Sequence, residues 1–405
     1  MNGALSWPFL RLYLLTLSYF SANSILNVII PLQGKSLGAT NTGIGIIMGA
    51  YLFTAMFFRP WAGQMIQKYG PIKVLRTILI LNGLALILYT FSGLEGYFAA
   101  RVMQGVCTAF FSMALQLGII DALPDKDRSQ GISLYSLCAY MPGIVGPLLA
   151  LGIWQAGDMG AFTMVMIALA MFTGLVGYSA RMDHKETAQA APEQTKQGAG
   201  MLKSFGQLTS NPYLFTCSVL MLTASMVFGS VTTFIPLYAG QIQGGHAGIY
   251  LMLQAGTLVL ARFTLRKKIP SDGKWHSSFI MGIMLMVAAA AQSVSFSIMG
   301  GAVFFYVGAV LMGMAQALLY PTLTTYLSFV LPQASRNMFI GLFVATADLG
   351  VSLGGVLMGP IADLTSYSSM YMICAMLGAS MILFAYVRRS KLVDTSGEKI
   401  VESIR

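Results

Sequence analysis

Long apolar stretches recur along the whole chain, and they restrict it to a helical membrane protein. About 20 apolar residues are enough to cross the hydrocarbon core of a bilayer as a helix, and the chain contains twelve stretches of this kind. Charged residues make up only 9% of the sequence, whereas soluble domains contain about 25%. The predicted spans are 9–32, 43–63, 72–92, 97–119, 131–154, 160–180, 212–238, 247–266, 277–297, 301–327, 338–360 and 369–387.

Basic residues are distributed unevenly between the predicted loops. Of the 24 Lys and Arg residues, all but Lys35, Arg59 and Arg101 fall at alternate loops and tails, which would share one side of the membrane. Such an excess marks the cytoplasmic side, so both termini are predicted to be cytoplasmic. The net charge of +10 therefore does not indicate a nucleic-acid partner. The first stretch lacks a small-residue cleavage site, so we expect a first helix rather than a signal peptide.

The two halves of the chain resemble each other. Residues 29–44 match residues 234–249 at a shift of 205, and Gly105 falls on Gly313 at a shift of 208. Repeated six-helix halves are typical of secondary transporters such as those of the major facilitator superfamily. We therefore predict an all-α fold of twelve transmembrane helices in two pseudo-symmetric halves. The expected segments are 1–180 (first half), 181–211 (cytoplasmic linker), 212–387 (second half) and 388–405 (cytoplasmic tail).

One acidic residue lies deep inside an apolar span. Asp348 is the only ionisable residue between Arg336 and Asp363 and sits near the middle of that stretch. A carboxylate there is costly unless it faces protein or water, and such acids usually mark ion or substrate paths. Small neighbours such as Gly350 allow another helix to approach closely. We predict that Asp348 binds the coupling proton; the alternative is a neutral Asp that packs helices together.

The fourth span carries Arg101 and Gly105, four residues apart and thus on one helix face. This arrangement resembles the helix-4 signature of the superfamily, an Arg followed by a Gly. The matching Arg of proton-coupled members is implicated in coupling, so the resemblance implies that role for Arg101. The alternative is an arginine that reaches to the outer membrane interface.

The loop after the second span resembles a superfamily signature at the cytoplasmic gate. It reads GQMIQKYGPIK over 63–73, and Gly63, Lys68 and Gly70 occupy signature positions. The resemblance implies a gating role for these three residues. The position that is acidic in the signature is Gln67 here, which weakens an ionic latch, and the second half has no clear copy of the loop.

Flexible spots are expected at matching places in the fifth and eleventh spans. Gly146 and Pro147 resemble the antiporter signature, whose Gly-Pro kinks the helix where the halves meet. At the repeat shift they fall on Gly354 and Gly355. We therefore predict gating roles for all four residues. The alternative is that Gly and Pro are simply frequent in membrane helices.

Arg59 and Arg262 lie near the cytoplasmic ends of the second and eighth spans, which are repeat mates. Facing a cavity, they would attract carboxylates of a substrate; alternatively, each reaches to lipid headgroups. Other polar residues in the spans are expected to bind substrate or, alternatively, to hydrogen-bond between helices. These are Asn27, Tyr51, Gln116, Gln254, Gln316 and Tyr320, together with Asn23 and Tyr326.

No cofactor is expected. The three His residues lie in loops or at span ends, and no intramembrane His or Cys pair has the spacing to hold a transition metal. The sequence has no complete Gly-x-x-x-x-Gly-Lys-Ser/Thr loop that would cradle a phosphate, and it has no nucleophile–base set. These observations argue against a metal site, an ATP-driven pump and an enzyme.

Long runs of the chain resemble one family. MNGALSWPFLRLY at the start, residues 93–124, YPTLTTYLSFVLP (320–332) and ADLGVSLGG (347–355) are similar to the staphylopine-type metallophore exporters of Gram-positive bacteria. The resemblance implies export of an opine-type metallophore, a small zwitterion with several carboxylates and amines. We expect it to leave the cytoplasm metal-free, in exchange for protons, through a monomer in the cell membrane lipid. The alternatives are a broad multidrug/proton antiporter and a membrane enzyme or receptor.

Overall fold

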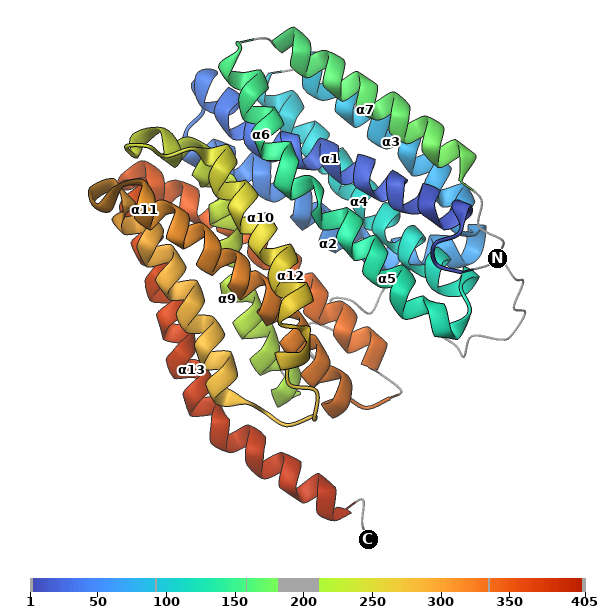
Figure 1. Cartoon of the computed structure of the whole chain (residues 1–405), viewed down its shortest axis with the longest axis vertical. Helices are drawn as coiled ribbons and strands as arrows, with labels where there is room; N and C mark the ends of the chain where they lie inside the picture. Colours follow the sequence, from blue (N-terminus) through green and yellow to red (C-terminus); the bar gives the residue numbers. More distant parts are fainter. Residues whose placement is uncertain (1–2, 92, 158, 181–210, 334–335, 403–405) are drawn as a thin grey trace. The chain divides into compact units, whose positions relative to one another are not determined.

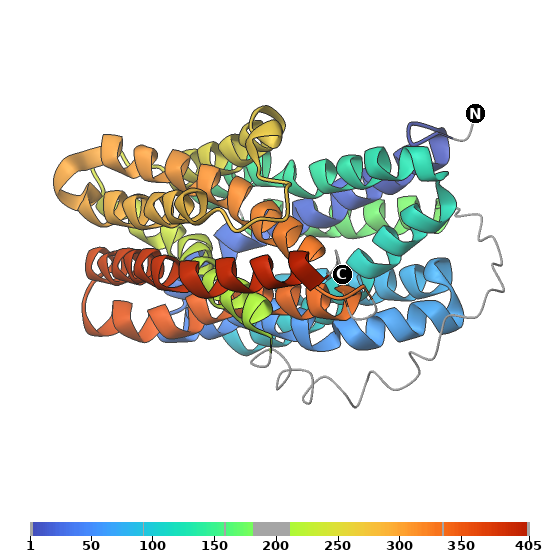
Figure 2. The same ribbon diagram turned by 90° about the horizontal axis from the view of Figure 1, so that it is seen from below.

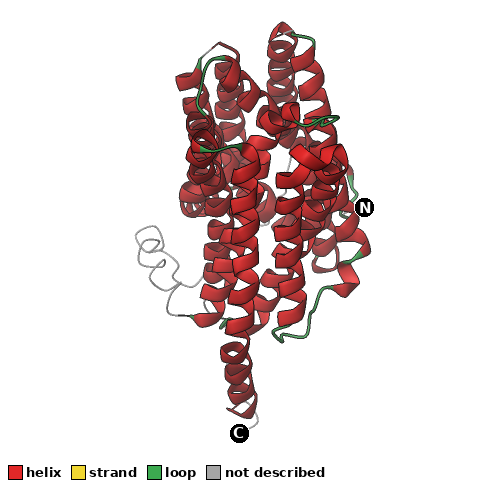
Figure 3. Cartoon of the chain, turned by 90° about the vertical axis from the view of Figure 1, so that its left-hand side faces the viewer, coloured by secondary structure: helices red, strands yellow, loops and turns green. Residues whose placement is uncertain are grey.

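The computed structural model describes residues 3–91, 93–157, 159–180, 211–333 and 336–402. All regular structure in these ranges is helical, which confirms the predicted fold class (Figure 3). The chain separates into two compact units, Met1–Met201 (unit 1) and Leu202–Arg405 (unit 2). In Figure 1 they run from blue to green and from yellow-green to red. The predicted linker 181–211 lies outside the described residues, apart from Asn211.

Unit 1 is a bundle in which two helices occupy the centre. The first helix packs against the fifth to seventh helices, and the fourth packs along the second and third. Their contact surface is apolar and buried, with Leu15, Phe111 and Leu115 fully shielded. The described helices are α1 (Trp7–Ser36), α2 (Asn41–Tyr69), α3 (Pro71–Phe91), α4 (Leu94–Ala122), α5 (Asp125–Tyr140), α6 (Pro142–Gln155) and α7 (Met159–Ser179).

The fifth predicted span is divided between α5 and α6. Met141 keeps helical dihedral angles, with φ −53° and ψ −38°, but Pro142 has no N–H to donate to the preceding turn. The Ser24 hydroxyl of α1 donates to the Pro142 carbonyl oxygen at 2.9 Å. The break therefore falls before Gly146 and Pro147, the pair at which the sequence predicted a kink.

The first helix described in unit 2 begins at Pro212. The side chain of Asn211 accepts hydrogen bonds from the backbone N–H groups of Tyr213 and Leu214, which caps the first helix. The last helix continues through the predicted tail, 388–405, as far as Glu402 (Figures 1 and 3). The described elements are α9 (Pro212–Tyr238), η1 (Ala239–Gln241), α10 (Ala247–Thr264), η2 (Arg266–Lys268), α11 (Ser277–Val330), α12 (Arg336–Leu364) and α13 (Tyr367–Glu402).

The helix α11 is two helices in one. Its 54 residues would extend about 80 Å at 1.5 Å per residue, far more than a bilayer core of about 30 Å. Gly301 interrupts it with φ 72° and ψ −165°, a conformation that a residue with a Cβ rarely adopts. Gly308 of the second arm lies against Ala290 and Val294 of the first, and Figure 2 shows the arms side by side. These arms are the predicted ninth and tenth spans.

The two units use the same helix contact at the same place in the repeat. Gly105 of α4 lies against Tyr51 and Thr54 of α2, where an added Cβ would be 2.9 Å from the Thr54 Cβ. Gly313 of α11 lies against α10 in the same way, 2.9 Å from the Thr257 Cβ. Glycine allows both pairs of backbones to approach closely, so the repeat seen in the sequence is also a repeat of packing.

Candidate functional site

Arg101 of α4 is completely buried in unit 1, with 0% of its surface exposed. One terminal nitrogen donates to the side-chain oxygens of Asn23 at 2.8 Å and Gln104 at 3.3 Å. The other donates to Asn27 at 2.8 Å. The guanidinium carbon lies 5.2 Å from the centre of the Tyr51 ring. We call these four neighbours the Arg101 cage; because they enclose the guanidinium, the interface-reaching alternative for Arg101 is wrong.

The Arg101 cage holds a positive charge with neutral groups. Three of its hydrogen-bond acceptors are amide oxygens and a fourth, at 3.4 Å, is the neutral sulfur of Met48, while the Tyr51 ring offers only its negative face. The Nε–H of Arg101 is buried and has no hydrogen-bond partner among the described residues. A buried cation is normally matched by an acid. The Arg101 cage contains no acidic side chain, so the positive charge of the guanidinium is not neutralised there and attracts an anionic group.

Hydroxyl groups extend the polar network from the Arg101 cage. The Tyr51 and Tyr19 hydroxyls both hydrogen-bond the Thr108 hydroxyl, at 3.0 and 2.9 Å. Tyr89 of α3 donates to the Gln104 oxygen at 3.0 Å. Buried polar groups connected in this way fix one arrangement of the helices that carry them. The network therefore ties α1, α2, α3 and α4 together.

Sequence reasoning missed two members of this network, Gln104 and Thr108. Both follow Arg101 on one face of α4, at three and seven residues, the spacing of a helical stripe. That spacing was the available signal. It was hidden because an uncharged residue in an apolar helix does not by itself indicate a site.

Unit 2 places a pair of glutamines where unit 1 has Tyr51 and Thr108. The Gln254 amide nitrogen donates to the Gln316 side-chain oxygen at 3.0 Å. Gln316 follows Gly313 by three residues, as Thr108 follows Gly105. Gln254 is 7% exposed and Gln316 is half-buried. The structure thus brings together two predicted substrate-binding residues, one from α10 and one from α11.

Asp348 is half-buried on α12. Gly350 and Gly354 of the same helix pack against α9; an added Cβ on Gly350 would lie 2.6 Å from the Ser225 Cβ. Residues two apart on an α-helix are about 200° apart around its axis. The glycines therefore fix α12 to α9 and leave Asp348 on a different face, which it shares with buried Gly355.

The predicted flexible spots of the fifth and eleventh spans, on α6 and α12, are close helix contacts. Gly146 of α6 lies against the side chain of Ser24 on α1, and Pro147 next to it is buried. Gly354 meets the backbone of α9, where an added Cβ would lie 2.8 Å from the Ser230 nitrogen. The two glycines thus occupy equivalent contacts within their own units.

The remaining candidates lie at separate places in the two units. Arg59 and Gln116 both lie near the Tyr135 hydroxyl of α5. Arg262 is half-buried in the last turn of α10. Tyr320 of α11 is half-buried, and its ring centre lies 6.0 Å from that of Phe343 on α12.

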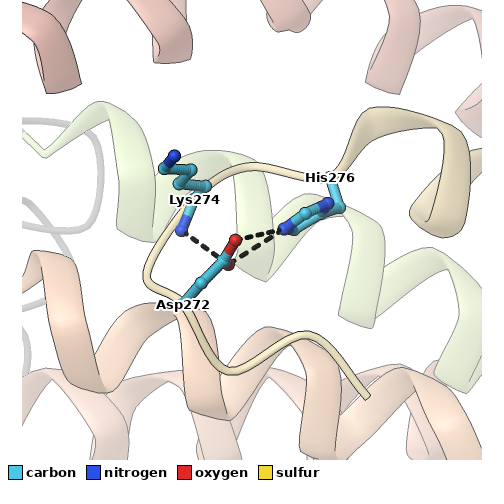
Figure 4. Close-up of polar contacts among 3 residues, drawn as sticks. All are labelled: Asp272, Lys274 and His276. Atoms are coloured by element: carbon cyan, nitrogen blue, oxygen red, sulfur yellow. Dashed lines mark hydrogen bonds and ion pairs between the residues drawn. The ribbon is translucent and has the colours of Figure 1, made fainter. Parts of the chain in front are cut away.

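A glycine with a positive φ occurs after α2 in unit 1 and between α10 and α11 in unit 2. Gly70 directly follows α2 with φ 81°, and Gly273, in the longer loop between η2 and α11, has φ 72°. Next to Gly273, the Asp272 carboxylate accepts hydrogen bonds from the His276 ring at 2.9 Å and from the Lys274 backbone N–H at 3.1 Å (Figure 4). The His276 contact holds the pKa of Asp272 below its usual value. Gly63 and Lys68 lie in the last two turns of α2.

Two packed repeats of membrane-length helices, each with a buried polar pair at the same contact, define a secondary-transporter fold. The sequence model of the Major Facilitator Superfamily matches residues 12–267, and the chain belongs to this superfamily. Eleven helices in the described ranges, one of them the folded-back α11, are long and apolar enough to cross a membrane. In the same ranges, no group of three or more His, Cys, Asp or Glu side chains is arranged to hold a metal ion.

Similar proteins confirm the resemblance found in the sequence. The staphylopine export protein of Staphylococcus aureus (strain Mu50 / ATCC 700699) is 54% identical over 96% of this chain and 98% of its own length. An uncharacterized MFS-type transporter of Burkholderia mallei (strain SAVP1) is 22% identical over 89% of this chain and 86% of its own. The protein is therefore a transporter and not an enzyme.

Solved structures share the fold at low sequence identity. The nucleoside transporter NupG has a TM-score of 0.72 and 14% identity, covering 94% of this chain and 99% of its own. A POT family transporter in complex with 5-aminolevulinic acid has a TM-score of 0.74 and 10% identity, covering 94% and 96%. At these identities the likeness concerns the fold and not the substrate.

Proposed function

We propose that this protein exports a metal-free opine-type metallophore, staphylopine or a close analogue, from the cytoplasm in exchange for protons. The observation that carries the proposal is the 54% identity to the staphylopine export protein over nearly both full lengths. The basic loops favour a cell-membrane orientation with both termini in the cytoplasm.

The Arg101 cage supports a substrate that carries carboxylates. Its guanidinium is buried among neutral groups, so it attracts anions and repels cations. Multidrug antiporters that move apolar cations would meet this repulsion. An opine-type metallophore offers several carboxylates instead, and the cage therefore favours metallophore export over the multidrug alternative.

Proton coupling is assigned to one acidic residue, Asp348, and one basic residue, Arg101. Asp348 is the ionisable residue within its span and changes charge when it takes up or releases a proton. Arg101 keeps its charge at all physiological pH values and is assigned to hold the anionic side of the exchange. The proposed gating residues are Gly63, Lys68 and Gly70 at the end of α2, Gly146 and Pro147 on α6, and Gly354 and Gly355 on α12.

Metal loading of the substrate gives the first test of this function. A metal-loaded chelator has already used its carboxylates and amines on the metal, so they no longer bind cationic side chains as free groups. Uptake of staphylopine by acid-loaded inside-out vesicles should therefore fall by about tenfold when excess zinc or nickel is added, the loss expected for one charged hydrogen bond. Vesicles without the protein give the background. Equal or faster uptake of the preformed zinc complex would contradict the proposal.

A second prediction concerns Arg59 and Arg262, proposed to collect the anionic substrate at the cytoplasmic opening. Each Arg→Gln substitution should raise the KM for staphylopine by roughly 1.4-fold to fivefold and leave kcat unchanged, because half-exposed charges contribute about 0.2–1 kcal/mol. Arg76, which is exposed on α3, provides the matched Arg→Gln control. Labelling that finds both side chains in lipid would refute the assignment.

A further inference from the structure

The glutamine pair of unit 2 is incompletely satisfied. A glutamine amide offers two N–H donors and an oxygen that accepts up to two hydrogen bonds. Gln254 uses one donor on the Gln316 oxygen. Its own side-chain oxygen is buried without any hydrogen-bond partner among the described residues. Because a buried acceptor without a donor is unfavourable, this oxygen calls for an explanation.

The equivalent pair in unit 1 does not leave such an atom. There, Thr108 bonds the hydroxyls of both Tyr51 and Tyr19, and Tyr19 comes from α1. At the repeat shift of 205 that matches α1 to α9, Tyr19 falls on Ala224, a buried residue that has no hydroxyl. Unit 2 thus lacks the third side chain that completes the pair in unit 1.

The two units also differ in whether a positively charged side chain lies near the equivalent polar pair. At the repeat shift of 208, Arg101 falls on Ala309 and Gln104 on Met312, both completely buried. The polar contacts of the glutamine pair therefore involve neutral amides rather than a guanidinium. An unpartnered amide oxygen attracts a hydrogen-bond donor, whereas the guanidinium of unit 1 attracts an acceptor.

We propose that Gln254 and Gln316 form a subsite of unit 2 that binds an amine of the substrate, with the Gln254 oxygen accepting a hydrogen bond from its N–H group. The subsite rests on the proposed metallophore function and specifies which chemical group unit 2 recognises. Gln316 is half-buried and gives the substrate access to the pair. Gly313 fixes its geometry, because it brings α11 against the Gln254 backbone oxygen.

The subsite also distinguishes the two forms of a metallophore. An amine of the metal-free form holds a proton on its nitrogen lone pair at neutral pH and is a charged donor, which makes a stronger hydrogen bond. In the metal complex the same lone pair is bound to the metal, and the ammonium charge is lost. An amide acceptor therefore prefers the metal-free form without any metal ligand of its own.

The test uses the full-length protein in proteoliposomes with two probes. One is metal-free staphylopine; the other is a derivative whose amines are acetylated, which keeps the carboxylates and removes the amine donors. Gln254→Met should raise the KM for staphylopine about tenfold, the value expected for one lost hydrogen bond to a charged group. The wild type should show a similar rise with the acetylated probe, and Gln254→Met should add no further rise to it.

Two further variants separate the subsite from a packing effect. Gln254→Glu keeps an acceptor, to which Gln316 can donate after its amide turns, so its KM for staphylopine should stay within about twofold of the wild type. Gln292→Met changes an exposed glutamine of α11 and should have no effect. A KM that rises equally for both probes in Gln254→Met, or a Gln254→Glu variant as impaired as Gln254→Met, overturns the subsite.

The same experiment distinguishes failure of the amine subsite from failure of the proposed transport function. Wild-type protein that does not move staphylopine refutes the proposed function, and the amine subsite with it. Wild-type transport with an unchanged Gln254→Met variant refutes the subsite alone. If Gln254→Met does not fold, Gln254→Glu and the acetylated probe still decide, because a wild type that moves both probes with equal KM does not recognise the amine.

Discussion

Asp348→Asn is expected to abolish proton-driven uptake of staphylopine by inside-out vesicles while the protein still inserts and binds substrate. The amide has nearly the shape of the carboxyl group but cannot take up or release a proton. Asp348 lies on a face of α12 other than the one that Gly350 and Gly354 fix against α9, so the substitution leaves that packing intact. Uptake under a pH gradient should drop to background. Exchange of labelled for unlabelled substrate without a gradient should stay within about threefold of the wild type, since uniform binding is retained.

Asp363→Asn is the matched control, because Asp363 is exposed near the end of the same helix. It should keep full proton coupling and a normal KM. Proton coupling like that of the wild type in Asp348→Asn would remove Asp348 from the mechanism. Loss of exchange together with coupling would instead make it a substrate-binding or packing residue, and the proton site would have to be sought elsewhere.

Arg101→Met should cause a clear loss of stability in unit 1. It leaves the half-buried oxygens of Asn23 and Asn27 without the donor that Arg101 gives them, whereas the Gln104 oxygen keeps the hydrogen bond from Tyr89. Each buried acceptor left unsatisfied costs about 1–3 kcal/mol, so we expect unfolding at a clearly lower temperature in detergent and uptake at background. Thermal unfolding monitored by fluorescence and vesicle uptake would measure both.

A second variant separates the charge of Arg101 from its structural role. Asn27→Asp keeps the hydrogen bond to Arg101 and adds a negative charge 2.8 Å from the guanidinium nitrogen, at the place of the present amide oxygen. The protein should remain at least as stable, because the buried cation gains a partner. Uptake of the carboxylate-rich substrate should nevertheless fall by about tenfold, since a neutralised site no longer attracts anions. Unchanged uptake would show that transport does not use the charge of Arg101.

The sequence predicted the elements better than their partners. Span length and loop charge were enough to find the helices, and Asn211 with Pro212 marked the start of α9 within one residue. The four-residue spacing of Arg101 and Gly105, which places them on one face of α4, also indicated a site. Which helix meets that face is a tertiary property, and a single sequence does not encode it locally. Asn23 and Asn27 were therefore recognised as polar residues of α1 but not as the groups that hold Arg101.

Other differences have equally specific causes. The division of the fifth span at Pro142 follows from a missing N–H, a signal that was present but outweighed by the Gly146–Pro147 resemblance. Gly70 and Gly273 share a positive φ, a conformation that glycine adopts readily, although the residues around them differ. Sequence matching between repeats detects the residues around such a turn and fails when those residues have diverged.

The single-residue reversal at Gly301 has a consequence for how the protein can be made and probed. The two arms of α11 are joined without a polar loop, and Gly308 holds them in contact close to the turn. We therefore expect the ninth and tenth spans to insert into the membrane together as one helical hairpin, because no hydrophilic segment separates them. For the experimenter, this turn is a poor place for an epitope, a protease site or a fused reporter. An insertion there would separate two arms that pack directly against each other.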